Sequence, residues 1–125
     1  MQLTVHVERY AIVRLDPDAE VPAWATTGPV SSVTRTESEL SIVCREDVVP
    51  DGSRAERGWR VLEVAGPLAF TLTGVLASLT TPLAAAGVTL FALSTFETDY
   101  LLVREHDLER ASAALREAGH GVAAP

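Results

Sequence analysis

The sequence predicts an α+β fold of two halves, each with an antiparallel sheet and helices packed on one face. Three observations lead to this prediction. Runs of β-branched and aromatic residues, typical of strands, alternate with segments of helical periodicity. The segment PDGSRAERG, residues 50–58, combines proline, glycine and charge and predicts a loop that separates residues 1–57 from residues 58–125. The first half also repeats the order of elements with which the second half begins.

The first half is predicted to contain three strands and one short helical turn. Residues 3–15 form the first strand, which ends at Asp16-Pro17 because proline cannot donate to a strand ladder. A helical turn follows over residues 22–25. The segments SSVTRTE, residues 31–37, and ELSIVCRE, residues 39–46, then form two short strands.

The strongest helical pattern of the chain lies in the second half, in TGVLASLTTPLAAAG, residues 73–87. Its apolar residues recur at helical spacing, which predicts a helix packed on a sheet. Thr73 is the expected N-cap, and Gly87 is the expected left-handed terminator. Pro82 lies inside this helix and removes the amide that would bond the carbonyl of Ser78, so we expect an irregularity there.

The remaining elements complete a known arrangement. We expect strands over residues 59–66, 88–95 and 98–105, a turn near 96–98, a helix over 106–119 with His106 or Asp107 near its N-cap and Gly119 as terminator, and a short strand over 121–123. Strand, helix, strand, strand, helix and strand is the βαββαβ order of the ferredoxin-like fold. An internal duplication at a spacing of about 60 residues follows from the repeated order.

Composition narrows the classes of function. Of 125 residues, 47% are hydrophobic, which allows a core without disulfides or a structural metal. A net charge of −7 with scattered basic residues argues against nucleic acid as a partner. The lone Cys44, expected in the core, together with the polar start of the chain and the lack of a long apolar run, predicts a cytoplasmic protein outside the membrane.

The passage TGVLASLTTPLAAAGVTLFALSTFETDYLLV resembles the ACT-type small-molecule-binding domain, and more narrowly its CASTOR-type branch, over roughly residues 59–110. Its most specific part is STFETDY, residues 94–100, after a glycine-led helix. The resemblance implies two ACT-like halves, an amino acid effector held at an interface between ACT units, and a homodimer. The animal arginine sensors of this branch carry an acidic residue where this chain has Leu72, so arginine is not implied as the effector.

Residue chemistry gives the same site a physical basis. A helix start presents unpaired amides and a positive dipole end that suit a carboxylate, and glycine allows close approach. Asp99 and the backbone of the neighbouring hairpin would accept hydrogen bonds from an ammonium group. The predicted ligand-binding residues are therefore Thr73, Gly74, Val75, Leu76, Thr95, Phe96, Thr98 and Asp99.

Plainer interpretations stay open beside this one. Polar residues are ordinary at a hairpin tip, and Gly74 also suits simple helix packing. The site would then be vestigial, and the chain would be an interaction or scaffold protein of the same fold. A third alternative is a small enzyme with Asp99 as general base.

The sequence lacks the groups of residues that are typical of catalytic or metal-binding sites. His6, His106 and His120 lack the spacing of metal ligands on one helix. The sequence contains no nucleophile elbow, phosphate-binding loop or dinucleotide fingerprint. We therefore expect no enzyme activity, no metal and no cofactor.

Overall fold

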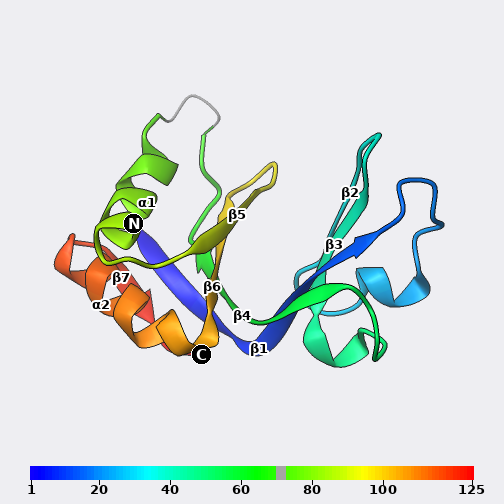
Figure 1. Ribbon diagram of the computed structural model, residues 1–125. Helices are drawn as coiled ribbons and strands as arrows, with labels where there is room; N and C mark the ends of the chain where they lie inside the picture. Colours follow the sequence, from blue (N-terminus) through cyan, green and yellow to red (C-terminus); the bar gives the residue numbers. More distant parts are fainter. Residues whose placement is uncertain (70–72) are drawn as a thin grey trace. The chain divides into compact units, whose positions relative to one another are not determined.

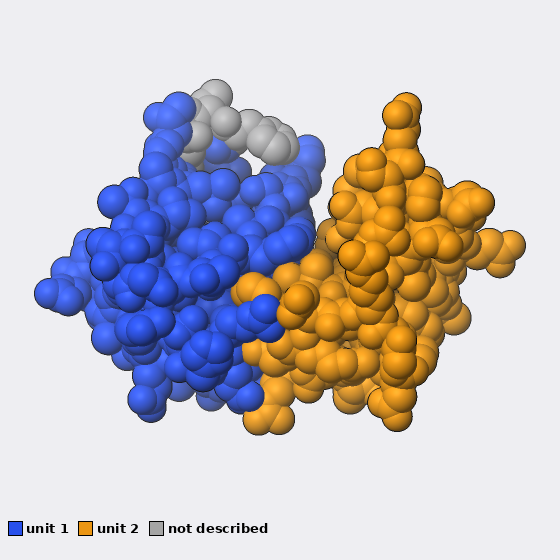
Figure 2. Space-filling view, viewed as in Figure 1, with its two compact units in different colours: residues 1–7, 60–125 blue, residues 8–59 orange. Residues whose placement is uncertain are grey.

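The computed structural model describes residues 1–69 and 73–125 and divides into two compact units. Unit 1 comprises residues 1–7 and 60–125, and unit 2 comprises residues 8–59 (Figure 2). The predicted α+β class is confirmed, because antiparallel strand pairs share the chain with a few helices. The predicted division into residues 1–57 and 58–125 stays a prediction.

Unit 1 contains strands in the order β1-β4-β6-β5, with β7 paired in parallel to β1 (Figure 1). These strands are β1 (Gln2–Leu15), β4 (Ala55–Val64), β5 (Leu90–Ser94), β6 (Asp99–Arg104) and β7 (Gly121–Ala123). One neighbour of β4 is β6, and the other is the strand at the beginning of the chain, with the short strand β7 beyond it. β1 and β4 both run through both units, because each is long enough to contribute one end to each.

The helices α1 (Val75–Ala85) and α2 (Leu108–Glu117) pack on one face of the unit 1 sheet. The strand residues of the core alternate in sequence, which places them on one face. Each fully buried leucine here contributes roughly 1.5–3 kcal/mol to stability. The core of unit 1 consists of Leu3, Val5, Leu62, Val64, Leu79, Leu83, Val88, Leu101, Val103, Ala111 and Leu115.

Unit 2 has strands in the order β2-β3-β1-β4, with β2 (Ser32–Arg35) and β3 (Leu40–Arg45). Short 3-10 helices, η1 (Ala23–Thr26) and η2 (Glu46–Val48), take the place of longer helices. Its core is small and contains Ala11, Val13, Ala25, Leu40, Ile42, Cys44 and Val49. Cys44 is fully buried, as the sequence predicts, and burial raises the pKa of its thiol above the usual range.

Two local predictions are wrong. The loop predicted over residues 50–58 ends early, because β4 begins at Ala55. The amide of Arg14 bonds the carbonyl of Arg54 at 2.9 Å, and this pairing with β1 overrides the local glycine and charge signals for a loop.

The N-cap of α1 is Gly74 and not Thr73. Gly74 has a φ of 75°, a left-handed conformation that a β-branched threonine adopts only with strain.

Pro82 lies within α1 without ending the helix. The carbonyl of Ser78, which lacks a helical donor because of this proline, accepts a 3.0 Å hydrogen bond from Nε2 of His120. At the start of α2, Asp107 occupies the N-cap position without a side-chain cap bond. Its carboxylate instead accepts a 2.7 Å hydrogen bond from Arg110. A third short 3-10 turn, η3 (Glu105–Asp107), precedes this helix.

Candidate functional site

A pocket of about 200 Å³ lies in unit 1 between the start of α1 and the end of the β5–β6 hairpin. We call it the α1–hairpin pocket. Three segments of the chain meet there: the stretch after β4, the first helical residue of α1 and the hairpin end. It is lined by Leu68, Ala69, Val75, Ser94, Thr95, Phe96, Glu97, Thr98 and Asp99.

The hairpin end is held by a short network of its own. Ser94 and Asp99 are the last residue pair of the ladder, which brings their side chains together. The hydroxyl of Ser94 donates a 2.6 Å hydrogen bond to Oδ1 of Asp99. The amide of Thr95 bonds the carbonyl of Thr98 at 2.9 Å and closes the turn. Asp99 is half-buried, lines the pocket and is held in place by the Ser94 hydroxyl.

Thr98 fastens the hairpin to the strand beside it. Its side chain is buried, and its hydroxyl donates a 2.6 Å hydrogen bond to the carbonyl of Val64. The amide of Leu68 bonds the carbonyl of Glu97 at 2.6 Å. A Cβ atom on Gly66 would lie 3.0 Å from Glu97 O and from Thr98 Cβ, so this close approach requires glycine. The Thr98 hydroxyl is used within the fold, although the residue lines the pocket.

The start of α1 forms the opposite wall. Gly74 caps the helix without a side-chain hydrogen bond, and its carbonyl accepts the first helical bond, from the amide of Ser78 at 2.9 Å. The amides of the first turn have no helical carbonyl to bond. Val75 and Leu76 both pack against the core, and Val75 also lines the pocket. Thr73 is exposed and precedes the cap.

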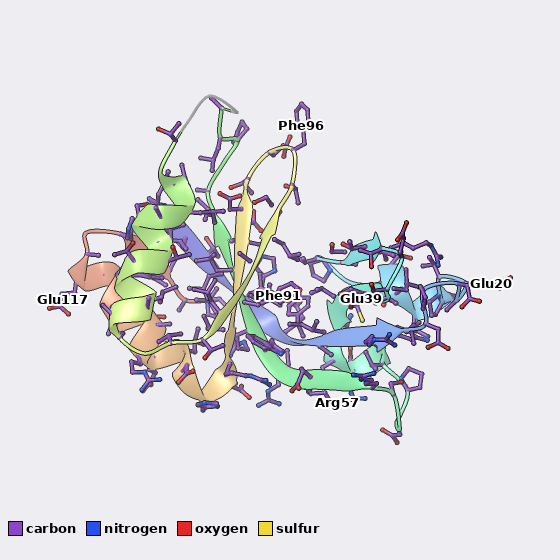
Figure 3. The ribbon with its side chains drawn as sticks, turned by 45° about the horizontal axis from the view of Figure 1, so that its top comes forward. Glu20, Glu39, Arg57, Phe91, Phe96 and Glu117 are labelled. Carbon is purple, nitrogen blue, oxygen red and sulfur yellow. The ribbon has the colours of Figure 1, made fainter. Side chains whose placement is uncertain are left out.

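The predicted site residues are thus brought together in part. Val75, Thr95, Phe96, Thr98 and Asp99 line one pocket, while Thr73, Gly74 and Leu76 belong to the adjoining helix turn without lining it. Leu72 lies outside the described residues. Phe96 is 79% exposed at the hairpin tip, from which it projects (Figure 3).

Sequence reasoning missed four lining residues: Leu68, Ala69, Ser94 and Glu97. A signal existed for Ser94, because a tight turn within STFETDY places it opposite Asp99 in an antiparallel register. Leu68 and Ala69 gave none, because they follow a proline in a stretch without periodicity.

The electrostatic character of the pocket is acidic. Asp99 and Glu97 are its charged lining residues among those described. Next to Asp99 in β6 lies Tyr100. Burial raises the pKa of Tyr100 above the usual range, and the nearby carboxylates of Glu63 and Glu97 raise it further. Such a pocket favours the cationic end of a ligand, while the amides of α1 favour an anionic end.

Residues 1–69 and 73–125 contain no group of three or more histidine, cysteine, aspartate or glutamate side chains arranged to hold a metal ion. In the same residues, no helix has the length and apolar character needed to cross a membrane.

Two family models match the chain. The model described as ACT domain covers residues 54–117, and a second, described as an N-terminal domain, covers residues 8–52. The curated relatives include the cytosolic arginine sensor for mTORC1 subunit 1 of Homo sapiens, which is 35% identical over 66 residues. That match covers 52% of this chain, and the chain spans only about a fifth (20%) of that relative's length.

Two solved structures also resemble this chain. Protein Atu0741 from Agrobacterium tumefaciens is 41% identical with a TM-score of 0.94, over 99% of this chain and 92% of that chain. The ligand-free regulatory subunit of aspartate kinase from Thermus thermophilus has a TM-score of 0.66 at 12% identity, over 94% of this chain and 96% of that chain. This second likeness concerns the fold alone.

Proposed function

The chain belongs to the ACT domain family, and we propose that it is a non-catalytic regulatory module that binds an amino acid in the α1–hairpin pocket. The observation that carries this proposal is that the pocket is lined by both Val75, at the start of α1, and Asp99. One pocket thus combines an acidic side chain with the positive end of a helix. A zwitterionic amino acid carries the two charges that complement these two sides of the pocket.

The proposed binding mode uses each wall for one end of the ligand. The ammonium group donates hydrogen bonds to Asp99, which Ser94 holds in place. The carboxylate accepts hydrogen bonds from the amides of Gly74, Val75 and Leu76, with Thr73 at the edge of the turn. Leu68 and Ala69 offer apolar surface to the ligand side chain. The backbone at Thr95, Phe96 and Thr98 completes the site.

The proposal extends to architecture and location. Residues 1–57 and 58–125 form two ACT-like halves, and the chain assembles as a homodimer through sheet edges or helices. A cytoplasmic location would match that of the cytosolic arginine sensor. Ligand binding would stabilise one arrangement of ACT units over another and so shift a population that a partner protein reads.

Thermal-shift screening against the twenty amino acids tests the proposal. A ligand at about 100 times its Kd stabilises the folded state by about 2.7 kcal/mol, which raises Tm by several degrees. We expect this shift from at least one amino acid at millimolar concentration. A flat response to all of them would contradict the proposal.

A pair of variants then locates the site. Asp99→Asn removes the charge that would bind the ammonium group and should weaken affinity about tenfold or more, because a hydrogen bond to a charged group contributes about 1.5–3 kcal/mol. Asp51→Asn is the matched control, since Asp51 is an exposed turn residue of unit 2. Equal affinity of the two variants would exclude Asp99 from the site.

Exposed Phe96 supports a second candidate function, a protein-docking module with a vestigial ligand site. An aromatic side chain that is 79% exposed at a hairpin tip is typical of an interface anchor. In that case the protein would ignore all amino acids and co-elute with one specific protein. Phe96→Ala should abolish this co-elution, while Val21→Ala, which truncates another exposed apolar residue, should preserve it.

A further inference from the structure

A second pocket, of about 280 Å³, lies within unit 2 on the sheet face opposite its core. Val13, Ile42 and Ala55 pack toward the core, so the alternating residues beside them face the other way. The pocket is lined by Ile12, Val13, Arg14, Glu39, Ser41, Arg54, Ala55 and Glu56. The side chains that face this pocket are the apolar Ile12, two arginines, two glutamates and Ser41.

Strand pairing arranges these side chains across three strands. Arg14 on β1 is paired with Ser41 on β3, and the amide of Arg14 bonds the carbonyl of Arg54 on the other side. Arg54, Arg14 and Ser41 therefore form one row across the sheet. Glu39 immediately precedes β3 and lies two residues before Ser41, so it borders this row; its position is labelled in Figure 3. The row spans roughly two strand spacings, about 10 Å of backbone, with a basic residue at one end and the acidic Glu39 next to the other.

The charged side chains of the pocket differ in whether other residues of the protein already bond them. Arg14 donates a 3.0 Å hydrogen bond to the carbonyl of Ser38 and lies 3.6 Å from Asp16. Within residues 1–69 and 73–125, the guanidinium of Arg54 and the carboxylate of Glu39 form no hydrogen bond or ion pair. The pocket therefore offers one cation and one anion that can both turn toward a ligand.

From this arrangement we propose that unit 2 holds a second small-molecule site, for an amphoteric ligand with an apolar side chain. Arg54, with Arg14 beside it, binds a carboxylate. Glu39 accepts hydrogen bonds from an ammonium group, and the ligand side chain lies on Ile12. This site is separate from the α1–hairpin pocket, since all its residues belong to residues 8–59.

The test is a titration of the full chain followed by backbone amide NMR, with L-leucine as the probe. Two analogues each remove one charge: leucinamide lacks the carboxylate, and 4-methylpentanoate lacks the ammonium group. We expect leucine to shift the amides of Ile12, Ser41 and Ala55. Each analogue should bind about tenfold more weakly or worse, because one charge-assisted contact is lost.

Variants separate this site from its neighbours. Arg54→Gln and Glu39→Gln should each weaken these shifts about tenfold, whereas the controls Arg116→Gln and Glu20→Gln, at residues outside the pocket, should leave them unchanged. Asp99→Asn should also leave them unchanged, so a failure of the α1–hairpin site would not affect this result. Unchanged binding in Arg54→Gln, or equal binding of leucine and 4-methylpentanoate, would overturn the proposal.

Discussion

The hydroxyl of Thr98 donates a 2.6 Å hydrogen bond to the carbonyl of Val64, a residue 34 positions earlier in the chain. Both groups are buried, so Thr98→Val should leave the carbonyl without its donor and cost about 1–3 kcal/mol in the free energy of unfolding. Urea denaturation measures this cost. Thr34→Val, at an exposed position of β2, should change stability by less than about 0.5 kcal/mol. Equal effects would show that the Thr98 bond does not stabilise the hairpin.

Glycine should be required at position 74 because of the left-handed backbone conformation there, and not because a side chain would lack room. A Cβ atom at this position would meet nothing within 4 Å, but the φ of 75° is unfavourable for other residues. Gly74→Ala should cost about 1 kcal/mol, and Gly74→Asn should cost less, because asparagine tolerates the left-handed region. Denaturation curves of the two variants compare these costs. A larger loss for asparagine would point to crowding instead of strain.

His120 and Pro82 should be energetically coupled through the carbonyl of Ser78. Removing the donor by His120→Ala should cost about 1 kcal/mol, because the carbonyl at 3.0 Å loses its partner. Pro82→Ala supplies a helical amide to the same carbonyl, so His120→Ala should cost less in that background. A double-mutant cycle of unfolding free energies measures the difference. Strictly additive effects would refute the coupling.

The pKa shift of Tyr100 makes stability depend on pH in the alkaline range. Burial and the carboxylates of Glu63 and Glu97 raise its folded-state pKa above the usual value of about 10. The folded state then retains the phenolic proton where the unfolded state loses it, so the stabilisation is complete below about pH 10 and falls as pH rises beyond it. Unfolding free energies at pH 9 and pH 11 should show a smaller fall for Tyr100→Phe than for the natural chain.

Sequence reasoning predicted the elements of this fold better than their partners. The helix over residues 73–87 and the hairpin around STFETDY are close to the observed α1, β5 and β6, because strong periodicity and turn residues are local signals. The pairing of β4 with the first strand of the chain was not predicted. Nothing near Gln2 or Leu3 in the sequence indicates a partner some 60 residues away, because sheet register is a tertiary property.

The candidate site shows the same limit. Asp99 and Val75 were predicted together from helix and hairpin chemistry, and they line one pocket. That Thr98 would direct its hydroxyl to Val64 was not predictable, since it depends on the close approach allowed by Gly66. Leu68 was missed for a related reason: its place in the pocket follows from its amide bond to Glu97.

The path of β1 has a practical meaning for anyone who wishes to divide this protein. A fragment that starts at residue 58 would retain both α1 and α2, yet one of the two strands beside β4 in unit 1 comes from residues 2–7. Such a fragment would expose the backbone amides and carbonyls along one margin of β4 and would tend to self-associate. A circular permutant that attaches residues 1–7 to the fragment would restore the β1 segment beside β4.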